Sequence, residues 1–277
     1  MISVEFFPPK DEAGGEQIVR AARAMREKVQ PDFVSITYGA GGTTRERTFR
    51  YASLLKDEYE FQVMPHLTCV GSSRHELLDI IRSYQKAGFC NLMALRGDPP
   101  RGEHTFTPHP DGLPYAQDLV SLVRENFSGF SIGVAGYPEV HPESPSSELD
   151  LKHLKDKVEA GSSFITTQLF YDNQCFLDFV HKCRETGIDV PIIPGLMPIR
   201  SAKQACRFCK HIPAELLKSL EAAEGDAARI RSIGIDWTYR QISELMDAGF
   251  KAFHLYIMNK GGMTTEVIQR LRDNKYL

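Results

Sequence analysis

The segment AGSSFITTQLFYD at residues 160–172 shows the unit from which the fold is predicted. Ala160-Gly161 has the pattern of a helix end, because glycine just past a helix can adopt the left-handed conformation that turns the chain back. The apolar run after it is typical of a buried strand, and Gln168 stands where that run has no need of an amide. The segment therefore predicts a helix end, a strand, and a polar side chain at the carboxyl end of the strand.

Eight apolar runs of this kind are spaced along the chain, with helical periodicity between them. In order they are SVEFFPP at 3–9, FVSITYGAGG at 33–42, QVMPHLT at 62–68, FCNLMALRGDPP at 89–100, FSIGVAGYPEVHPE at 130–143, FITTQLFYD at 164–172, VPIIPGLMP at 190–198 and FKAFHLYIMNK at 250–260. Eight alternating strand–helix units predict an α/β fold, a single (β/α)8 TIM barrel spanning residues 1–277. An open doubly wound sheet is the alternative, and the count of eight strands favours the barrel.

The segments between the runs carry helix signals. Apolar residues recur at three- and four-residue steps over 18–29, which predicts one buried helix face. Capping boxes and helix-ending glycines repeat elsewhere: Ser73 with Glu76, Thr43 with Glu46, Ala87-Gly88, Thr186-Gly187 and Ala248-Gly249. The same helix-ending glycine before several strands supports a fold built from one repeated strand–helix unit.

Composition narrows the class of protein. A chain of 277 residues with 42% hydrophobic content can form one barrel, which typically needs about 250 residues. The net charge of −3 arises from 33 basic and 36 acidic residues spread along the chain, which weighs against a nucleic-acid surface. No apolar run approaches the ~20 residues of a membrane span, and no signal pattern precedes the first strand. A cytoplasmic enzyme is expected.

The six cysteines are expected to be free thiols, because no secretory signal is present. Cys206 and Cys209 form a C-x-x-C, but it lies in an apparently helical stretch and no second pair has zinc-type spacing. No metal site is therefore predicted.

The first strand contains an acidic residue among apolar neighbours. Burial of Glu5 between Val4 and Phe6 is expected to raise its pKa, and a carboxyl group protonated near neutral pH can act as a general acid. A carboxylate paired with a barrel arginine for structural reasons is the other interpretation.

Asp98 follows Arg96-Gly97 at a strand end and precedes two prolines, so it is predicted in a rigid turn at the mouth of the barrel. It could equally serve as a turn-forming or helix-capping residue. The Pro/Gly/His-rich stretch from Pro99 to Tyr115 is predicted to be a long loop of the kind that often forms a lid.

Two further loops are candidates for ligand contacts. Backbone amides at 39–44 (GAGGTT) could approach a phosphate at a helix start, although a plain tight turn fits as well. Two prolines limit the conformations of 137–143 (YPEVHPE). Tyr137 and His141 could therefore contact a ligand with little loss of conformational entropy in the loop. Gln168 is expected to end the sixth strand, and Asn259 and Lys260 follow the eighth, where they could contact an anionic substrate tail or be solvated.

These motifs, in this order, resemble the methylenetetrahydrofolate reductases, flavin-dependent barrel enzymes of one-carbon metabolism. The resemblance runs almost end to end, through EFFPP at 5–9, VSITYGAGG at 34–42, PHLTC at 65–69, ALRGDPP at 94–100, GYPEVHPE at 136–143, AGSSFITTQLFYD at 160–172, PIIPGLMPI at 191–199 and FHLYIMNK at 253–260. It implies FAD as cofactor, NADH or NADPH as electron donor, and 5,10-methylenetetrahydrofolate as the substrate reduced to 5-methyltetrahydrofolate.

The resemblance also implies roles for individual residues. Glu5 matches the acid that protonates the folate, and Asp98 matches the aspartate beside the flavin. The positions that would hold FAD are Thr37, Tyr38, Ala40, His66, Arg96, Gly97, Asp98, Ala116, Tyr137, His141, Asp150, His153 and Lys157. The positions that would contact the substrates are Gln168, Gln204, Phe208 and Lys260. A ping-pong cycle, with both substrates using one site in turn, is implied as well.

Some positions depart from the family pattern. Asp156 stands where relatives carry an arginine near the FAD phosphates, and a carboxylate there would be repulsive. Lys260 replaces an arginine and would contact the folate tail as a point charge. No C-terminal regulatory domain is expected. The protein is expected to form a homo-oligomer. A flavin-free pterin-binding barrel and a non-catalytic paralogue are the alternative interpretations.

Overall fold

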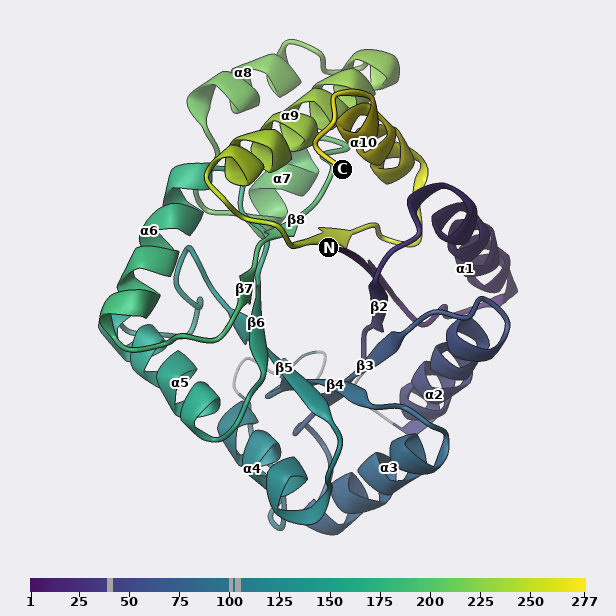
Figure 1. Cartoon of the computed structure of the whole chain (residues 1–277), viewed down its shortest axis with the longest axis vertical. Helices are drawn as coiled ribbons and strands as arrows, with labels where there is room; N and C mark the ends of the chain where they lie inside the picture. Colours follow the sequence, from purple (N-terminus) through teal and green to yellow (C-terminus); the bar gives the residue numbers. More distant parts are fainter. Residues whose placement is uncertain (39–41, 100–101, 103–105) are drawn as a thin grey trace.

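A computed structural model describes residues 1–38, 42–99, 102 and 106–277 and shows a ring of parallel strands surrounded by helices (Figure 1). The strands are β1 (Ile2–Phe6), β2 (Phe33–Ile36), β3 (Val63–Thr68), β4 (Asn91–Leu95), β5 (Ser131–Gly136), β6 (Phe164–Thr167), β7 (Ile192–Ile193), β8 (Gly195–Leu196) and β9 (Phe253–Tyr256). Their order in the sheet is β7-β6-β5-β4-β3-β2-β1-β9-β8. The predicted TIM barrel is confirmed, and the open doubly wound sheet is wrong because the strands follow chain order around the ring, the first strand pairs with the last, and the two ends of this order, β7 and β8, are consecutive in the chain.

The seventh predicted strand is divided into two. Within VPIIPGLMP, β7 pairs with β6 and β8 pairs with β9, and Pro194 lies between them. Proline has no backbone N–H to give to a ladder, and the Pro194 carbonyl instead accepts a hydrogen bond from His254 N at 2.9 Å. The two short strands together occupy the place of one barrel strand and bring the ends of the ring together.

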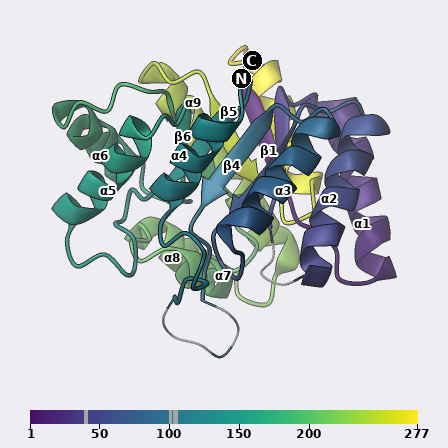
Figure 2. The same ribbon diagram turned by 90° about the horizontal axis from the view of Figure 1, so that it is seen from below.

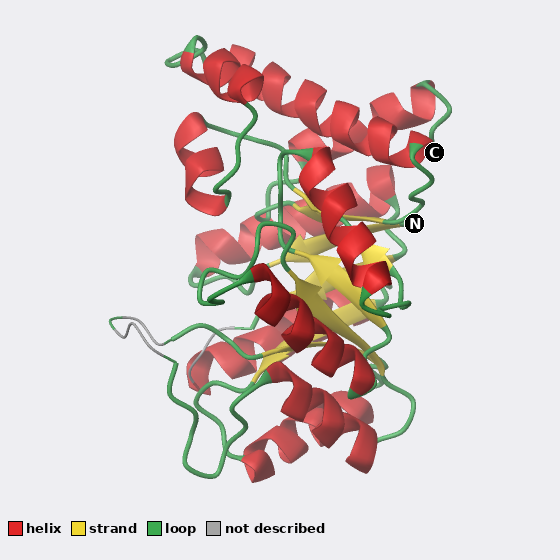
Figure 3. Ribbon diagram, turned by 90° about the vertical axis from the view of Figure 1, so that its left-hand side faces the viewer, coloured by secondary structure: helices red, strands yellow, loops and turns green. Residues whose placement is uncertain are grey.

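Helices cover the outside of the strands (Figure 3). They are α1 (Glu12–Ala24), which continues as the π-helix η1 (Met25–Val29), α2 (Gly42–Asp57), α3 (Arg74–Lys86), α4 (Ala116–Asn126), α5 (Ser147–Glu159), α6 (Asn173–Glu185), α7 (Ala202–Phe208), α8 (Ala214–Glu221), α9 (Ala227–Asp247) and α10 (Gly262–Asp273). No described helix is long and apolar enough to cross a membrane.

The local helix signals are found where they were predicted. Ser73 and Glu76 form a reciprocal capping box at the start of α3. The four helix-ending glycines, Gly88, Gly161, Gly187 and Gly249, all have positive φ, between 79° and 111°. This backbone region is open to glycine at little cost, which explains why the same residue type ends each of these helices. The side chain of Thr43, which was predicted to form a capping box with Glu46, lies outside the described residues.

Strand alternation divides the barrel into an apolar shell and a polar interior. In β1, Ile2, Val4 and Phe6 belong to the core between strands and helices, while Ser3 and Glu5 lie between them in sequence and are also buried. In β9, Phe253 and Leu255 belong to the same core, and His254 alternates with them. Because successive side chains of a strand point to opposite faces, Glu5 and His254 point into the barrel.

The connection between the seventh and eighth barrel strands is enlarged by two extra helices. Figure 2 shows α7 and α8 together at one end of the barrel. A small apolar cluster, which includes Leu169, Met197, Ile199, Leu216 and Leu220, packs beneath them. This cluster anchors α7, whose last residue, Phe208, remains 38% exposed at the edge of the site described next.

Candidate active site

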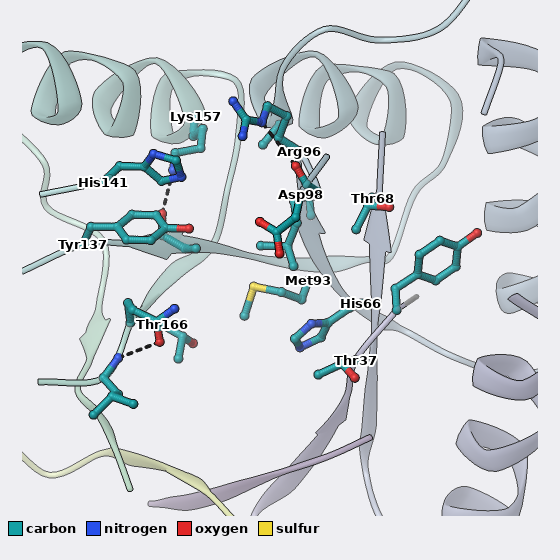
Figure 4. Close-up of a pocket in the computed structure, with 18 of the residues that line it drawn as sticks. Thr37, His66, Thr68, Met93, Arg96, Asp98, Tyr137, His141, Lys157 and Thr166 are labelled. Atoms are coloured by element: carbon teal, nitrogen blue, oxygen red, sulfur yellow. Dashed lines mark hydrogen bonds between the residues drawn. The ribbon is translucent and has the colours of Figure 1, made fainter. Parts of the chain in front are cut away.

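A cavity of about 610 Å³ opens at the carboxyl ends of the strands (Figure 4). All but three of the predicted site residues line it. They are Glu5, Thr37, Tyr38, His66, Arg96, Gly97, Asp98, Ala116, Tyr137, His141, Asp150, His153, Lys157, Gln168 and Phe208. They come from most of the strand–helix units, as expected of a barrel whose loops build the site at one end.

Two predicted residues are placed elsewhere, and a third, Ala40, lies outside the described residues. Gln204 uses its side chain at the start of α7, where Oε1 accepts a hydrogen bond from Arg200 N at 2.8 Å. Lys260 is exposed and lines a separate cavity. The described structure therefore does not bring Gln204 and Lys260 into the main cavity.

Glu5 forms the floor of the cavity together with two histidines. Its Oε2 atom lies 3.4 Å from His66 Nε2 and 3.6 Å from His254 Nε2. Ser35 donates a hydrogen bond to the same oxygen at 3.4 Å, and the hydroxyl of Ser3 is 2.8 Å from His254 Nδ1. All of these side chains are buried, so the carboxyl group is part of a polar cluster enclosed by the barrel.

The protonation of this cluster differs from the expectation drawn from burial alone. Burial raises the pKa of Glu5. This effect is outweighed by the opposite effects of the His254 side chain, of positive charge on His66 and His254, and of the Ser35 hydroxyl, so the pKa lies below its ordinary value. The predicted rise in the pKa of Glu5 is therefore wrong for the free site. Burial lowers the pKa of His66, which favours its neutral form near pH 7.

His254, Ser35 and Tyr256 line or support the site but were not predicted. A signal for them exists in the alternation of the strands. Side chains two residues apart in a strand point to the same face. Ser3 therefore shares the inner face with Glu5, Ser35 shares it with Thr37, and His254 and Tyr256 share it with Met258. Tyr256 donates a hydrogen bond to Thr167 O at 2.7 Å and thereby joins β9 to β6 across the barrel.

Arg96 and Asp98 project from the segment that follows β4. Figure 4 shows the Asp98 carboxylate pointing into the cavity. The Arg96 guanidinium makes two hydrogen bonds of 2.7 Å to Glu143, lies over the Phe106 ring at 4.9 Å, and has a pKa raised first by that Glu143 contact. The site thus combines a carboxylate that pairs with no described cation with an arginine that Glu143 holds in place.

The proline-containing loop after β5 is held by its own side chains. The rings of Tyr137 and His141 meet edge to face, with centroids 4.5 Å apart. His141 N donates to Asp150 at 3.2 Å, and Glu139 accepts from Lys210 N at 2.7 Å. Burial raises the pKa of Tyr137 to about 12, so its hydroxyl remains a donor at neutral pH. These contacts fix the two rings against the cavity, in agreement with the rigidity predicted from the prolines.

Lys157 supplies a positive charge at the same wall. Its ammonium donates to Ala135 O at 2.6 Å, and burial lowers its pKa to about 8 (Figure 4). The neighbouring Asp156 pairs with Lys152 at 2.8 Å and does not line the cavity in the described structure. The Asp156 carboxylate therefore does not place the expected repulsive charge in the cavity.

The volume and lining of the cavity suit a large, partly anionic molecule. Its walls include the apolar Met93, Ala94 and Leu95, and its cations are Arg96 and Lys157. The hydroxyls of Thr68 and Thr166 also line it and are buried without a hydrogen-bond partner. A buried hydroxyl without a partner is costly, so a bound molecule with polar edges would stabilise both.

The cysteines take no part in this arrangement. All six are free, with Cys206 exposed and Cys209 buried at the end of α7. Within the described ranges, no group of three His, Cys, Asp or Glu side chains could hold a metal ion.

Comparison with known proteins identifies the family. A family model described as methylenetetrahydrofolate reductase matches residues 1–272. The 5,10-methylenetetrahydrofolate reductase of Escherichia coli (strain K12) is 37% identical over 276 residues, covering 98% of this chain and 90% of the relative. Methylenetetrahydrofolate reductase (NADH) 1 of Arabidopsis thaliana is 39% identical over 271 residues, covering 93% of this chain and 46% of the relative.

The chain thus spans about half the length of the plant relatives and most of the bacterial one. Among solved structures, an uncharacterized protein from Clostridium thermocellum that binds two copies of 5-methyl-5,6,7,8-tetrahydrofolic acid has a TM-score of 0.65. It is 17% identical and the match covers 100% of this chain and 95% of that one, which supports the barrel fold. The extent of the family match, together with these identities, shows that the chain belongs to the methylenetetrahydrofolate reductase family.

Proposed function

We propose that this protein reduces 5,10-methylenetetrahydrofolate to 5-methyltetrahydrofolate with NADH or NADPH, using FAD bound in the large cavity. The observation that carries the proposal is the pair of carboxylates that face this cavity: Glu5, buried between two histidines, and Asp98, exposed at its mouth. An acid at the floor and a carboxylate at the mouth suit a reaction that needs both a proton and a stabilised cation.

The residues of the cavity fit FAD. Arg96 and Lys157 offer positive charge to its phosphates, and the unpartnered hydroxyls of Thr68 and Thr166 offer hydrogen bonds to polar edges. The other candidate contacts are Thr37, Tyr38, Ala40, His66, Gly97, Asp98, Ala116, Tyr137, His141, Asp150 and His153. When bound, FAD would supply the hydride that reduces the folate, after receiving it from the nicotinamide nucleotide.

Glu5 provides the proton that the folate needs. Protonation of N10 allows the bond between the bridging methylene and N10 to break, which leaves a 5-iminium cation ready to accept hydride. A folate ring in the cavity excludes water from Glu5, which strengthens the effect of burial and raises the pKa of its carboxyl. Proton uptake by Glu5 therefore accompanies binding of the folate.

Asp98 stabilises the cation that results. Its carboxylate points into the cavity and, among the described residues, has no ion-pair partner. Gln168 and Phe208 line the same cavity and would contact the pterin or the nicotinamide, whereas Gln204 contacts Met197 at the wall of this cavity and Lys260 lines a neighbouring one. A shared cavity is consistent with substrates that bind in turn.

An anaerobic absorbance spectrum of the purified protein tests this proposal. A flavin band that bleaches on addition of NADH or NADPH, and returns on addition of methylenetetrahydrofolate, is expected. A colourless protein that fails to take up added FAD would instead favour a flavin-free pterin barrel. Flavin binding without any bleaching would favour a non-catalytic paralogue.

A further inference from the structure

Glu139 joins two loops of the barrel that are 71 residues apart in the chain. It lies in the loop after β5, and its Oε2 atom accepts a hydrogen bond from Lys210 N at 2.7 Å. Its Oε1 atom accepts one from His211 N at 3.4 Å, so one carboxylate holds two consecutive amides of the connection between α7 and α8. Hydrogen bonds to an ionised acceptor are stronger than those between neutral groups, which makes this a firm contact for a half-buried side chain.

The loop that carries Glu139 is folded into a tight turn. Val140 N donates to Tyr137 O at 3.1 Å, which places Glu139 at the corner of this turn. Val140 has a φ of 65°, a left-handed conformation that is unfavourable for a β-branched residue and persists only where surrounding contacts stabilise it. Tyr137 and His141, on either side of the turn, line the large cavity, whereas Glu139 does not line it in the described structure. The two rings therefore border the cavity while the carboxylate between them binds the segment after α7.

The segment that Glu139 binds follows the exposed aromatic residue of the site. α7 ends at Phe208, which lines the cavity and is 38% exposed. Cys209 leaves the helix in an extended conformation, with φ −126° and ψ 144°, and the next two amides are those that bind Glu139. Packing holds this helix through Ala205 and Cys209, which are buried. The position of the Phe208 ring therefore also depends on how the chain beyond it is fixed.

Both sides of this contact are attached to the segment that follows β6. Cys175 in α6 donates its Sγ–H to Pro138 O at 3.4 Å. Cys209 donates its Sγ–H to Leu169 O, also at 3.4 Å. Burial, followed by the negative charge of Glu139, raises the pKa of Cys175 to about 11, so this thiol remains a donor at neutral pH. The loop after β5, the start of α6 and the end of α7 thus form one packed unit around the Glu139 carboxylate.

We propose that Glu139 is a positioning residue that fixes the Phe208 ring at the edge of the cavity by binding the segment directly after it. The inference rests on the proposed function, in which Phe208 contacts the pterin and the nicotinamide in turn. Since both substrates would meet the same ring, loss of the Glu139 contact weakens the binding of both. His141 is held separately, by the hydrogen bond from its backbone N–H to Asp150, so the affinity for FAD does not depend on Glu139.

Substitution of Glu139 tests this role, with Asp32 as a matched control. E139Q keeps one acceptor but sets an NH2 group against the second amide, and E139L removes both acceptors. E139Q is expected to raise the half-saturating concentration of NADH or NADPH for flavin reduction, and of methylenetetrahydrofolate for flavin reoxidation, by roughly two- to tenfold, the range for one hydrogen bond. E139L should have the larger effect, while limiting rates and FAD affinity stay within about twofold. Asp32 also accepts a backbone N–H, from Ile2 at 2.6 Å, but at the opposite end of the strands, so D32N should leave these concentrations unchanged.

A double-mutant cycle shows whether Glu139 acts through the Phe208 ring. F208A is expected to raise the same half-saturating concentrations, and E139Q should add little to them in the F208A background. A merely destabilising effect of E139Q would be equal in both backgrounds. A rise by the same factor with and without the Phe208 ring would therefore refute the role, and so would a loss of FAD affinity without any change for the substrates.

Hydrogen–deuterium exchange separates failure of this inference from failure of the proposed function, because it needs no turnover. The amides of Lys210 and His211 are expected to exchange at least about tenfold faster in E139L than in the unmodified protein, and D32N should not change them. Faster exchange in a protein that does not oxidise NADH or NADPH would reject the proposed function but support the positioning of this segment by Glu139. Equal exchange in E139L and the unmodified protein, or unchanged half-saturating concentrations in E139Q and E139L of an active protein, would overturn the inference.

Discussion

The Oε2 atom of Glu5 lies 3.6 Å from Nε2 of His254 although the two residues are 249 positions apart in the chain. The parallel register of β1 and β9 sets Ser3 beside His254 and Glu5 beside Tyr256, so the carboxyl and the imidazole meet diagonally inside the barrel. His66 approaches the same oxygen from β3 at 3.4 Å. The closure of the barrel therefore brings together the polar cluster around the Glu5 carboxyl.

Replacement of Glu5 by Gln should separate the two half-reactions. The amide cannot deliver a proton to N10, so the rate of folate reduction is expected to fall by roughly two orders of magnitude or more, while flavin reduction by NAD(P)H stays largely intact. Rapid mixing under anaerobic conditions measures both rates. Equal retention of both rates would contradict the assignment of Glu5 as the acid.

The pH dependence of folate reduction should respond to His254. The pKa of Glu5 lies below its ordinary value partly because of His254, so H254Q is expected to raise it. In the proposed mechanism, folate reduction needs protonated Glu5 and slows as pH rises through that pKa, so the decline should move to higher pH in H254Q. H75Q, on the exposed part of α3, is the matched control and should leave the profile unchanged. A decline displaced to lower pH in H254Q would argue against this coupling.

Replacement of Asp98 by Asn should affect both half-reactions in opposite directions. Loss of the negative charge favours reduced flavin, so its potential is expected to rise by on the order of 10–30 mV, which corresponds to about 1 kcal/mol for two electrons. The folate cation is then less stabilised and its reduction slows. Potentiometric titration and half-reaction rates test this, with D111N, on the loop before α4, as the control. Unchanged potential and rates in D98N would exclude the role.

Lys157 should make FAD affinity depend on pH. Burial lowers its pKa to about 8 in the free site, and nearby phosphates would raise it, so binding of FAD is coupled to retention of a proton. Affinity is therefore expected to be constant below about pH 8 and to fall by up to tenfold per pH unit above it. K157M should bind FAD weakly, and its affinity should not decline with pH. K155M, which loses a surface pair with Glu159, is the control and should show the same decline as the unmodified protein. Fluorescence titration between pH 7 and 9.5 distinguishes these results.

The parts of the fold that depend on local chemistry could be predicted from the sequence. Gly88, Gly161, Gly187 and Gly249 mark helix ends because positive φ is a property of single residues. The polar residues at strand ends line the cavity because all the parallel strands have their carboxyl ends at the same face of the barrel. Both patterns can be read without knowing which strands are neighbours.

The remaining features depend on contacts between distant segments. His254 and Ser35 adjoin Glu5 only through strand register, which a single strand does not reveal, and the direction of the shift in the pKa of Glu5 depends on those neighbours. The division of the seventh strand at Pro194 likewise follows from its two different partners. Resemblance assigned Gln204 and Lys260 to the substrate by position, whereas the direction of their side chains depends on local contacts around Arg200.

Asn259 holds the end of β1 in place from the opposite end of the chain. Its side-chain amide accepts a hydrogen bond from Phe7 N at 3.0 Å and donates one to Phe7 O at 2.9 Å, and its φ of 51° is in the left-handed region that asparagine tolerates. N259D keeps the acceptor but sets a carboxylate oxygen against the Phe7 carbonyl. The free energy of unfolding is expected to fall by about 1–3 kcal/mol, the cost of an unsatisfied buried group, and folate reduction should slow because Glu5 lies two residues before Phe7.

The control for Asn259 is another asparagine that donates to a carbonyl. Asn274 donates to Arg270 O at 2.8 Å on the exposed end of α10, and N274D should change the unfolding free energy by less than about 0.5 kcal/mol. Urea denaturation followed by circular dichroism compares the two variants. Equal stability of N259D and N274D, with equal rates of folate reduction, would show that the Asn259–Phe7 contact does not position Glu5.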